Sequence, residues 1–145
     1  MEIYTTGFTR KTAEQFFEEL TSAGIRRVLD VRLRNASQLS GFTRGVDLPY
    51  FLDRLAGAKY DHPIQLAPTS ELLDAYRRRQ IPWDQYAERF VELIRERRVE
   101  EMLSPDEFAE PTVLLCSELK PEHCHRRLVA EYLKSRWPDI NVRHL

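Results

Sequence analysis

Apolar and polar positions along the first third of the chain follow two periods, one typical of buried strands and one typical of amphipathic helices. Residues 3–6 form a short β-prone run. Apolar residues then recur at helical spacing at Ala13, Phe16, Phe17 and Leu20. Thr12 with Gln15 resembles a capping box before this helix, and Gly24 is placed to end it in a left-handed conformation. A buried strand at residues 28–32 follows, so this part predicts a βαβ unit.

The middle of the chain predicts a loop and three helices. Residues 33–45 are rich in Arg, Asn, Ser and Gly, which is typical of an ordered loop. Asp47 is placed to cap a short helix whose apolar side carries Leu48, Phe51, Leu52 and Leu55. A brief extended piece around Tyr60 precedes a helix that starts near residues 69–70. The strongest helical pattern begins at Pro82 and turns inward Trp83, Tyr86, Ala87, Phe90, Val91 and Ile94.

The last third repeats the order strand, helix, strand. Residues 113–116 form a compact apolar strand, and Pro121 is expected to open a helix that stops at Pro138. The core side of this helix consists of Leu128, Val129, Tyr132, Leu133 and Trp137. Residues 140–145 alternate as a closing strand does. Strands that alternate with helices predict a mainly parallel sheet covered on both faces, and therefore a single three-layer α/β/α domain over residues 1–145.

Length and charge narrow the class of protein. A chain of 145 residues has the size of one domain and buries enough surface to fold without a metal or a disulfide. The formal net charge of -1 argues against nonspecific duplex binding driven by a broad basic field. Neither a signal peptide nor a membrane-spanning window is apparent, so we expect a cytoplasmic protein with no membrane partner, reduced thiols and no cofactor.

Polar residues follow the predicted strands at one edge of the expected sheet. In open parallel sheets, ligands bind outside the carboxyl ends of the strands, because loops and helix N-termini converge there. The strand at residues 28–32 delivers Asp30 and Arg32 to that edge, and the loop after it carries Ser37. A buried Asp30 needs a partner such as Arg32 or Arg126, and this pairing fits a structural salt bridge and a ligand site equally well.

The segment CSELKPEHCHRR, residues 116–127, gathers thiols, carboxylates, imidazoles and guanidinium groups in one strand-to-helix connection. The first-turn amides and the dipole of a helix favour anions. We therefore expect a lowered pKa for the Cys124 thiol and an anion beside it, with a bidentate contact from Arg126. Packing as a small hydrophobe is the alternative for Cys124. It is the preferred interpretation for Cys116, which ends an apolar strand.

Two other kinds of site use the same residues. Cys116, Cys124 and His125 have the chemistry of three metal ligands, but neighbouring residues on a helix point in different directions and no CxxC pair is present. We therefore rank a metal below an anion and predict no metal site. A redox pair of thiols is the other option, because a strand end and the following helix start can approach disulfide distance. Tyr60 and Trp83 are expected to be core aromatics rather than stacking platforms.

Five segments carry a resemblance to a known family: YTTGF, LDVR, NASQLSGF, LAPTSELL and LLCSELKPEHCHRRLVAEYL. With them the chain resembles the domain-of-unknown-function 488 family from end to end, although Asn35 stands where many relatives have a proline. The resemblance supports the α/β fold and implies no substrate. It also supports one set of site residues, namely Asp30, Arg32, Ser37, Cys116, Glu118, Cys124, His125 and Arg126.

These residues lead to alternative functions. The first is an enzyme acting on a phosphate-bearing or other anionic substrate, such as a nucleotide or nucleic-acid component, with Cys124, Glu118 and His125 in the chemistry. The ligand-binding residues would then be Asp30, Arg32, Ser37, Cys116 and Arg126. The second is a noncatalytic module that binds an anion or a nucleic-acid component in the same pocket, and the third is a thiol redox or sulfur-transfer protein. One concavity is expected to hold Asp30, Arg32, Glu118, Cys124 and Arg126.

Overall fold

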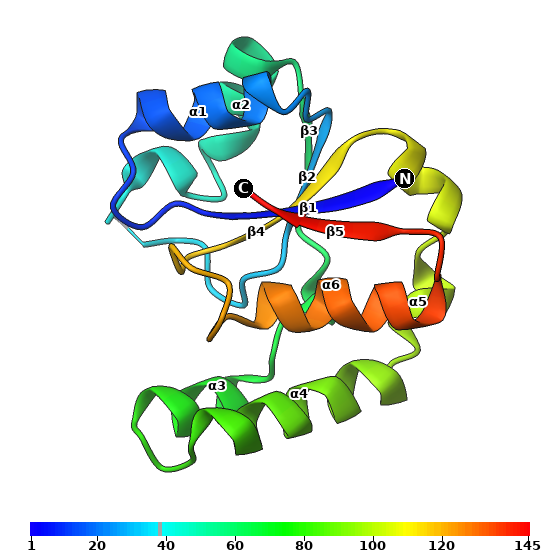
Figure 1. The fold of residues 1–145 in the computed structure, drawn as a ribbon. Helices are drawn as coiled ribbons and strands as arrows, with labels where there is room; N and C mark the ends of the chain where they lie inside the picture. Colours follow the sequence, from blue (N-terminus) through cyan, green and yellow to red (C-terminus); the bar gives the residue numbers. More distant parts are fainter. Residues whose placement is uncertain (38) are drawn as a thin grey trace.

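A five-stranded parallel sheet lies between two layers of helices in the computed structural model, which describes residues 1–37 and 39–145 (Figure 1). The strands lie side by side in the order β3-β2-β4-β1-β5. They are β1 (Glu2–Gly7), β2 (Arg27–Asp30), β3 (Lys59–Asp61), β4 (Thr112–Cys116) and β5 (Asn141–His144). The predicted α/β fold with a mainly parallel sheet is thereby confirmed.

Helices cover both faces of the sheet. Those of the described residues are α1 (Ala13–Ser22), α2 (Leu48–Ala56), α3 (Ser70–Arg77), α4 (Trp83–Glu96), α5 (Val99–Met102) and α6 (His125–Arg136). Helices α1 and α2 lie on one face, and α6 lies on the other with α3 and α4 beyond it (Figure 1). Among the helices of residues 1–37 and 39–145, none has the length and apolar character needed to cross a membrane.

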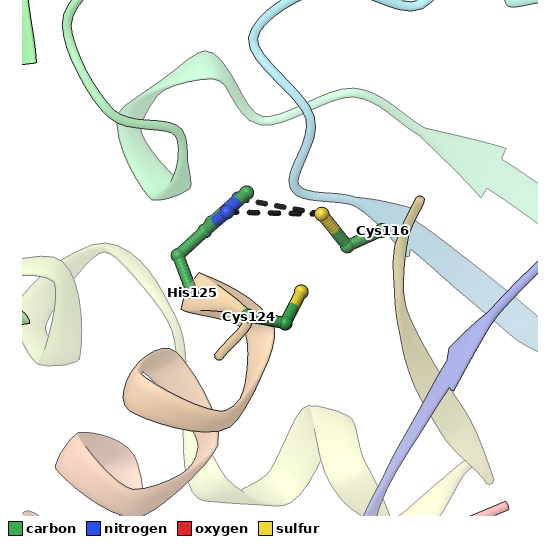
Figure 2. Close-up of side chains that lie close together, drawn as sticks. All are labelled: Cys116, Cys124 and His125. Atoms are coloured by element: carbon green, nitrogen blue, oxygen red, sulfur yellow. Dashed lines mark hydrogen bonds between the residues drawn. The ribbon is translucent and has the colours of Figure 1, made fainter. Parts of the chain in front are cut away.

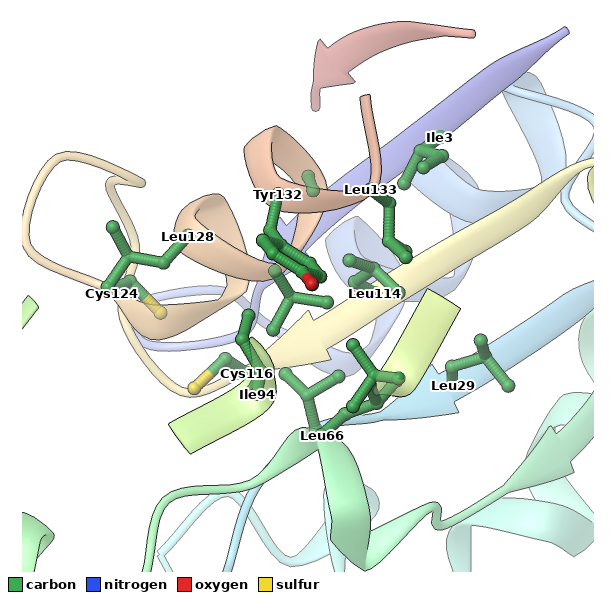
Figure 3. Packing of buried hydrophobic residues seen from close by; sticks show 14 of the residues in the cluster. Ile3, Leu29, Leu66, Ile94, Leu114, Cys116, Cys124, Leu128, Tyr132 and Leu133 are labelled. Carbon is green, nitrogen blue, oxygen red and sulfur yellow. The ribbon is translucent and has the colours of Figure 1, made fainter. Parts of the chain in front are cut away.

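Successive residues of the central strands point to opposite layers, as the pleat of a strand requires. Val28 and Val113 belong to the core under α1 and α2, whereas Leu29 and Leu114 belong to the core under α4 and α6. Figure 3 shows Cys116 on the same side as Leu114, beside the first turn of α6. The period of two along β4 therefore directs the Cys116 thiol toward the start of α6.

Most helix ends lie where the sequence predicts them. Thr12 and Gln15 form the predicted capping box, with the Gln15 N–H donating to Thr12 Oγ1 at 3.1 Å and the Thr12 N–H donating to Gln15 Oε1 at 2.8 Å. Gly24 follows α1 with φ +70°, and Thr69 caps α3. Asp47 occupies the N-cap position of α2, but its side chain makes no capping hydrogen bond, in contrast to the prediction.

The start of α6 also differs from the prediction. Pro121 was expected to open this helix, but residues before His125 form a turn in which the Cys124 N–H donates to the Pro121 carbonyl at 3.1 Å. Cys124 is the N-cap residue and has extended backbone angles, φ -132° and ψ 135°. The direction of the Cys124 side chain is therefore not fixed by helical backbone geometry. At the other end, Trp137 is the C-cap residue and packs beside the core.

The sheet changes winding direction between two neighbouring strands. Strand β2 pairs with β4, yet the chain leaving β2 reaches α2 in one layer and the chain leaving β4 reaches α6 in the opposite layer. The loops that follow β2 and β4 therefore run to opposite faces of the sheet and leave a gap at the carboxyl ends of these two strands. In open α/β sheets this topological switch point is where ligands bind.

Candidate functional site

A cavity of about 90 Å³ lies at this switch point, and we call it the edge pocket. Its lining comes from the segments that follow β2 and β4, from the start of α6 and from the facing turns of α3 and α4. These residues are Arg32, Leu33, Arg34, Leu73, Tyr76, Arg77, Trp83, Tyr86, Cys116, Ser117, Glu118, His123, Cys124 and His125. Its inner end contains the buried Cys116, Cys124 and His125, and exposed side chains such as Arg77 and Glu118 form its outer end.

The two thiols and one imidazole converge at the inner end (Figure 2). One atom from each of Cys116, Cys124 and His125 lies within 4.8 Å of the other two. The Cys116 Sγ is 3.7 Å from His125 Nδ1, and His125 Nε2 is 2.6 Å from the Val31 carbonyl oxygen. Because a carbonyl only accepts, Nε2 carries the proton and Nδ1 presents its lone pair. The edge of the imidazole also meets the Phe90 ring at 5.3 Å between centroids.

The two thiols influence each other's pKa in opposite directions. A hydrogen bond from Cys124 lowers the pKa of the Cys116 thiol, and this effect outweighs burial. The same hydrogen bond, together with burial, raises the pKa of the Cys124 thiol well above its ordinary value. The raised pKa of Cys124 is the opposite of the lowered pKa expected for it, because the Cys116 thiol and burial outweigh His125 and Arg126, which act to lower it. Burial lowers the pKa of His125, which keeps its imidazole neutral near pH 7.

Asp30 and Arg32 form a buried ion pair behind the pocket wall. The Arg32 Nε and Nη2 donate to the two carboxylate oxygens at 2.8 Å each, and Nη2 also donates to the Thr43 carbonyl at 2.6 Å. The Tyr60 hydroxyl donates to Asp30 Oδ2 at 2.6 Å. Burial would raise the pKa of Asp30, but the hydrogen bonds and charge of Arg32 leave it below its usual value. Asp30 thus has a structural role, while Arg32 contributes to the wall.

Arg126 is entirely buried and does not line the edge pocket. Its Nη1 donates to the Glu118 carbonyl, its Nη2 to the Leu119 carbonyl at 3.3 Å and its Nε to Thr5 Oγ1 at 3.3 Å. The guanidinium therefore fastens the turn after β4 to β1. The predicted bidentate contact between Arg126 and an anion is not compatible with this position, because its donors face the protein interior.

The expected concavity is present, but its lining residues differ in part from the predicted ones. Arg32, Glu118 and Cys124 line it together with Cys116 and His125. Three predicted site residues are not among its lining residues: Asp30, Ser37 and Arg126. Ser37 is exposed, and its hydroxyl accepts from the Leu39 N–H at 3.1 Å.

Sequence reasoning missed the side of the pocket built by α3 and α4. The Trp83 and His123 rings stack at 5.1 Å. Trp83 packs against the core as expected, and it also lines the pocket, which was not expected. Tyr60 packs beside the α1 and α2 core as expected. Tyr76 and Arg77 stand three and four positions after Leu73 on one face of α3. The sequence shows this spacing, but it contains no signal that this face of α3 lies near the carboxyl end of β4.

Comparisons with known proteins give one match. No curated protein and no solved structure matches the chain. A family model described as "Domain of unknown function DUF488" matches residues 12–133, which include the thiols, the imidazole and the α3 and α4 wall of the edge pocket. Since the match covers most of the 145 residues, the chain belongs to the DUF488 family of domains of unknown function.

Proposed function

We propose that the protein is an enzyme that binds a small anionic substrate in the edge pocket, with phosphate-bearing compounds such as nucleotides or nucleic-acid components as the substrate class. The proposal rests on the contrast between the two ends of the pocket: buried thiols and an imidazole lie at the inner end, and exposed arginines and partly buried aromatic rings lie at the outer end. Concave sites of this kind, with a few convergent polar groups, bind small molecules. Thiols and imidazoles perform nucleophilic and acid–base chemistry.

The size of the pocket limits which part of a substrate enters it. A volume of about 90 Å³ suits a group of the size of a phosphate better than a whole nucleotide. An open depression adjoins the pocket, shares Tyr76 and Arg77 with it and is also lined by Arg79; we call it the outer hollow. A substrate would place its reacting group in the edge pocket and its remainder in the outer hollow, where guanidinium groups and a tyrosine ring are available.

Arg77 is the principal anion contact in this proposal. It is exposed at the junction of the edge pocket and the outer hollow, and it forms no salt bridge with any residue that the structure describes. Arg34, by comparison, already pairs with Asp74 at 3.1 Å. A hydrogen bond to a charged group contributes about 1.5–3 kcal/mol, which corresponds to roughly tenfold or more in affinity.

Binding is tested by titration of the protein with inorganic phosphate and with each nucleoside monophosphate, followed by thermal shift and calorimetry. We expect saturable stabilisation by at least one of these compounds. The Arg77→Ala variant should bind about tenfold more weakly. Arg78→Ala is the matched control, because Arg78 is the next residue of the chain, is exposed and lines neither cavity. Equal weakening in both variants, or no saturable binding, contradicts the proposal.

Catalysis is tested separately from binding. Cys116→Ser should abolish conversion of the bound compound while leaving the Arg77-dependent part of its affinity in place, because Arg77 and the outer hollow remain intact. Unchanged turnover in this variant would remove the thiol from the chemistry. Binding without turnover of any bound compound would favour the noncatalytic module.

A further inference from the structure

Three potential metal ligands meet where β4 ends and α6 begins. Cys116 is the last residue of β4, Cys124 is the N-cap of α6 and His125 is its first residue. Their ligand atoms lie within 4.8 Å of one another, and Cys116 Sγ is 3.7 Å from His125 Nδ1. In a tetrahedral zinc site, bond lengths of about 2.0–2.3 Å place such atoms about 3.4–3.8 Å apart. The ligand atoms are therefore close to the required separations, and rotation of the side chains, chiefly of the imidazole, would complete the tetrahedral geometry.

The backbone at Cys124 removes the geometric objection to a metal. Consecutive residues within a helix point in different directions, but Cys124 precedes the helix and has extended angles. Figure 2 shows the Cys124 and His125 side chains reaching the same region as Cys116. The sequence argument against a metal treated Cys124 and His125 as neighbours within a helix and noted that no CxxC pair is present. The structure starts the helix at His125, so the first of these two reasons does not apply.

The imidazole has the tautomer that a metal ligand needs. Its Nε2–H donates to the Val31 carbonyl at 2.6 Å, which leaves the Nδ1 lone pair free to coordinate. Histidine ligands in metal sites characteristically donate their second ring N–H to a carbonyl or a carboxylate. Cys116 Sγ lies 3.7 Å from Nδ1 and 3.9 Å from Nε2, so the thiol lies beside the ring rather than along the Nδ1 lone pair, and the imidazole has to turn when it binds the ion.

Ligand chemistry and charge select the ion. Two thiolates and a neutral imidazole suit Zn²⁺ and give a neutral complex. Arg126 is a buried cation near both thiols, and it forms no salt bridge with a carboxylate in the described part of the chain. Its charge favours negative groups at the cluster, namely the thiolates and an anion bound as the fourth ligand.

We propose that Cys116, Cys124 and His125 bind one Zn²⁺ ion whose fourth coordination position faces the edge pocket. All three residues line the pocket, and no fourth Cys, His, Asp or Glu of the described residues joins the cluster. Sites with three protein ligands and one open position are typical of catalytic zinc, whereas structural zinc has four protein ligands. The open position would take water or the anionic group of a substrate. This role for the ion deepens the proposed function, but metal binding itself does not depend on it.

The experiment uses the full chain without a histidine tag, purified in the absence of chelators. Metal analysis should show about one zinc per chain. After removal of the metal, titration with Co²⁺ under reducing conditions should give a saturable spectrum with intense tetrahedral d–d bands and sulfur-to-cobalt charge transfer, which equimolar Zn²⁺ should abolish. Weak octahedral bands, or no charge transfer, would overturn the proposal. So would a Cys116–Cys124 disulfide that forms equally fast with and without Zn²⁺.

Variants identify the ligands. Cys124→Ser and His125→Ala should each reduce zinc affinity at least about 100-fold. Loss of a residue that only supports a metal ligand reduces affinity by about 10–100-fold, and loss of a ligand itself should cost at least as much. His123→Ala is the matched control, because His123 is exposed, lines the same pocket and lies outside the cluster. Circular dichroism shows whether each variant is folded. If a variant is unfolded, the Co²⁺ spectrum of the wild-type protein still tests whether the site binds a metal. Equal zinc affinity in all three variants would overturn the assignment. A negative result leaves the Arg77 binding test unaffected, so the two proposals can fail separately.

Discussion

The ion pair between Asp30 and Arg32 gives the sharpest test of how the end of β2 is held. In the Asp30→Asn variant the side chain keeps its size but loses its charge, and it can no longer accept from both Nε and Nη2 of Arg32. The guanidinium then remains buried, with only 5% of its residue surface exposed, and retains the Thr43 carbonyl as its described acceptor. Removing one partner of a buried pair typically costs about 3–5 kcal/mol.

A loss of this size is measurable without preventing folding. Domains are stable by about 5–15 kcal/mol, and a urea m-value of about 1–3 kcal/mol/M converts the loss into a midpoint decrease of about 1–5 M. Equilibrium urea unfolding at pH 7, followed by circular dichroism, provides the measurement. The control is Asp74→Asn, because Asp74 accepts from both terminal nitrogens of Arg34 in a similar geometry but on the surface. We expect no measurable change there, since exposed ion pairs are screened by solvent.

Acidification provides an independent check of the same interaction. The pKa of Asp30 is lower in the folded protein than in the unfolded chain, so its contribution is fully present above the unfolded value of about 3.9. It is lost as the pH falls through the folded pKa. The stability difference between wild type and Asp30→Asn should therefore shrink below about pH 4. If Asp30→Asn behaves like Asp74→Asn at pH 7, or if the difference grows in acid, the ion pair does not stabilise the pocket wall.

Two further predictions concern the same edge of the sheet. Gly7→Ala should destabilise the protein by more than about 3 kcal/mol in urea unfolding, because a Cβ atom at Gly7 would lie 1.6 Å from the Glu118 carbonyl oxygen. Gly41→Ala, which meets nothing within 4 Å, should be nearly neutral, and equal effects of the two substitutions would contradict the close approach. Tyr60→Phe should cost about 1–3 kcal/mol by removing a hydrogen bond to the Asp30 carboxylate, and it should flatten the acid dependence of stability. An unchanged midpoint would show that solvent replaces the hydroxyl.

The sequence predicts the layers of this fold well because they depend on local periodicity. The apolar period of 3.6 at Phe16, Phe17 and Leu20 and the buried run ending at Cys116 each correspond to an element of the structure. The Thr12 and Gln15 capping box is likewise local, since both partners lie within one turn. Strand order is different, because β1 pairs with β4 across more than 100 residues and no local signal encodes that pairing.

The candidate site was predicted less completely for the same reason. Cys116, Cys124 and His125 come from one strand-to-helix connection, so the sequence brings them close together. Arg77 and Trp83 reach the pocket because α3 packs on α4 and α4 packs on α6, and the second of these contacts joins segments far apart in the sequence. Their types alone gave no reason to choose them over the other arginines and aromatics of the chain.

Arg126 was expected to bind the ligand, but in the structure it shapes the turn that brings Cys124 and His125 close to Cys116. Its guanidinium binds the carbonyls of Glu118 and Leu119, which draws the turn after β4 toward the sheet. A helix beginning at Pro121 would not leave Cys124 in the extended N-cap conformation, whereas the observed turn does. That conformation lets Cys124 and His125 approach Cys116 together. The residue expected to bind the ligand instead positions the side chains that can, and its buried charge favours an anionic group beside them.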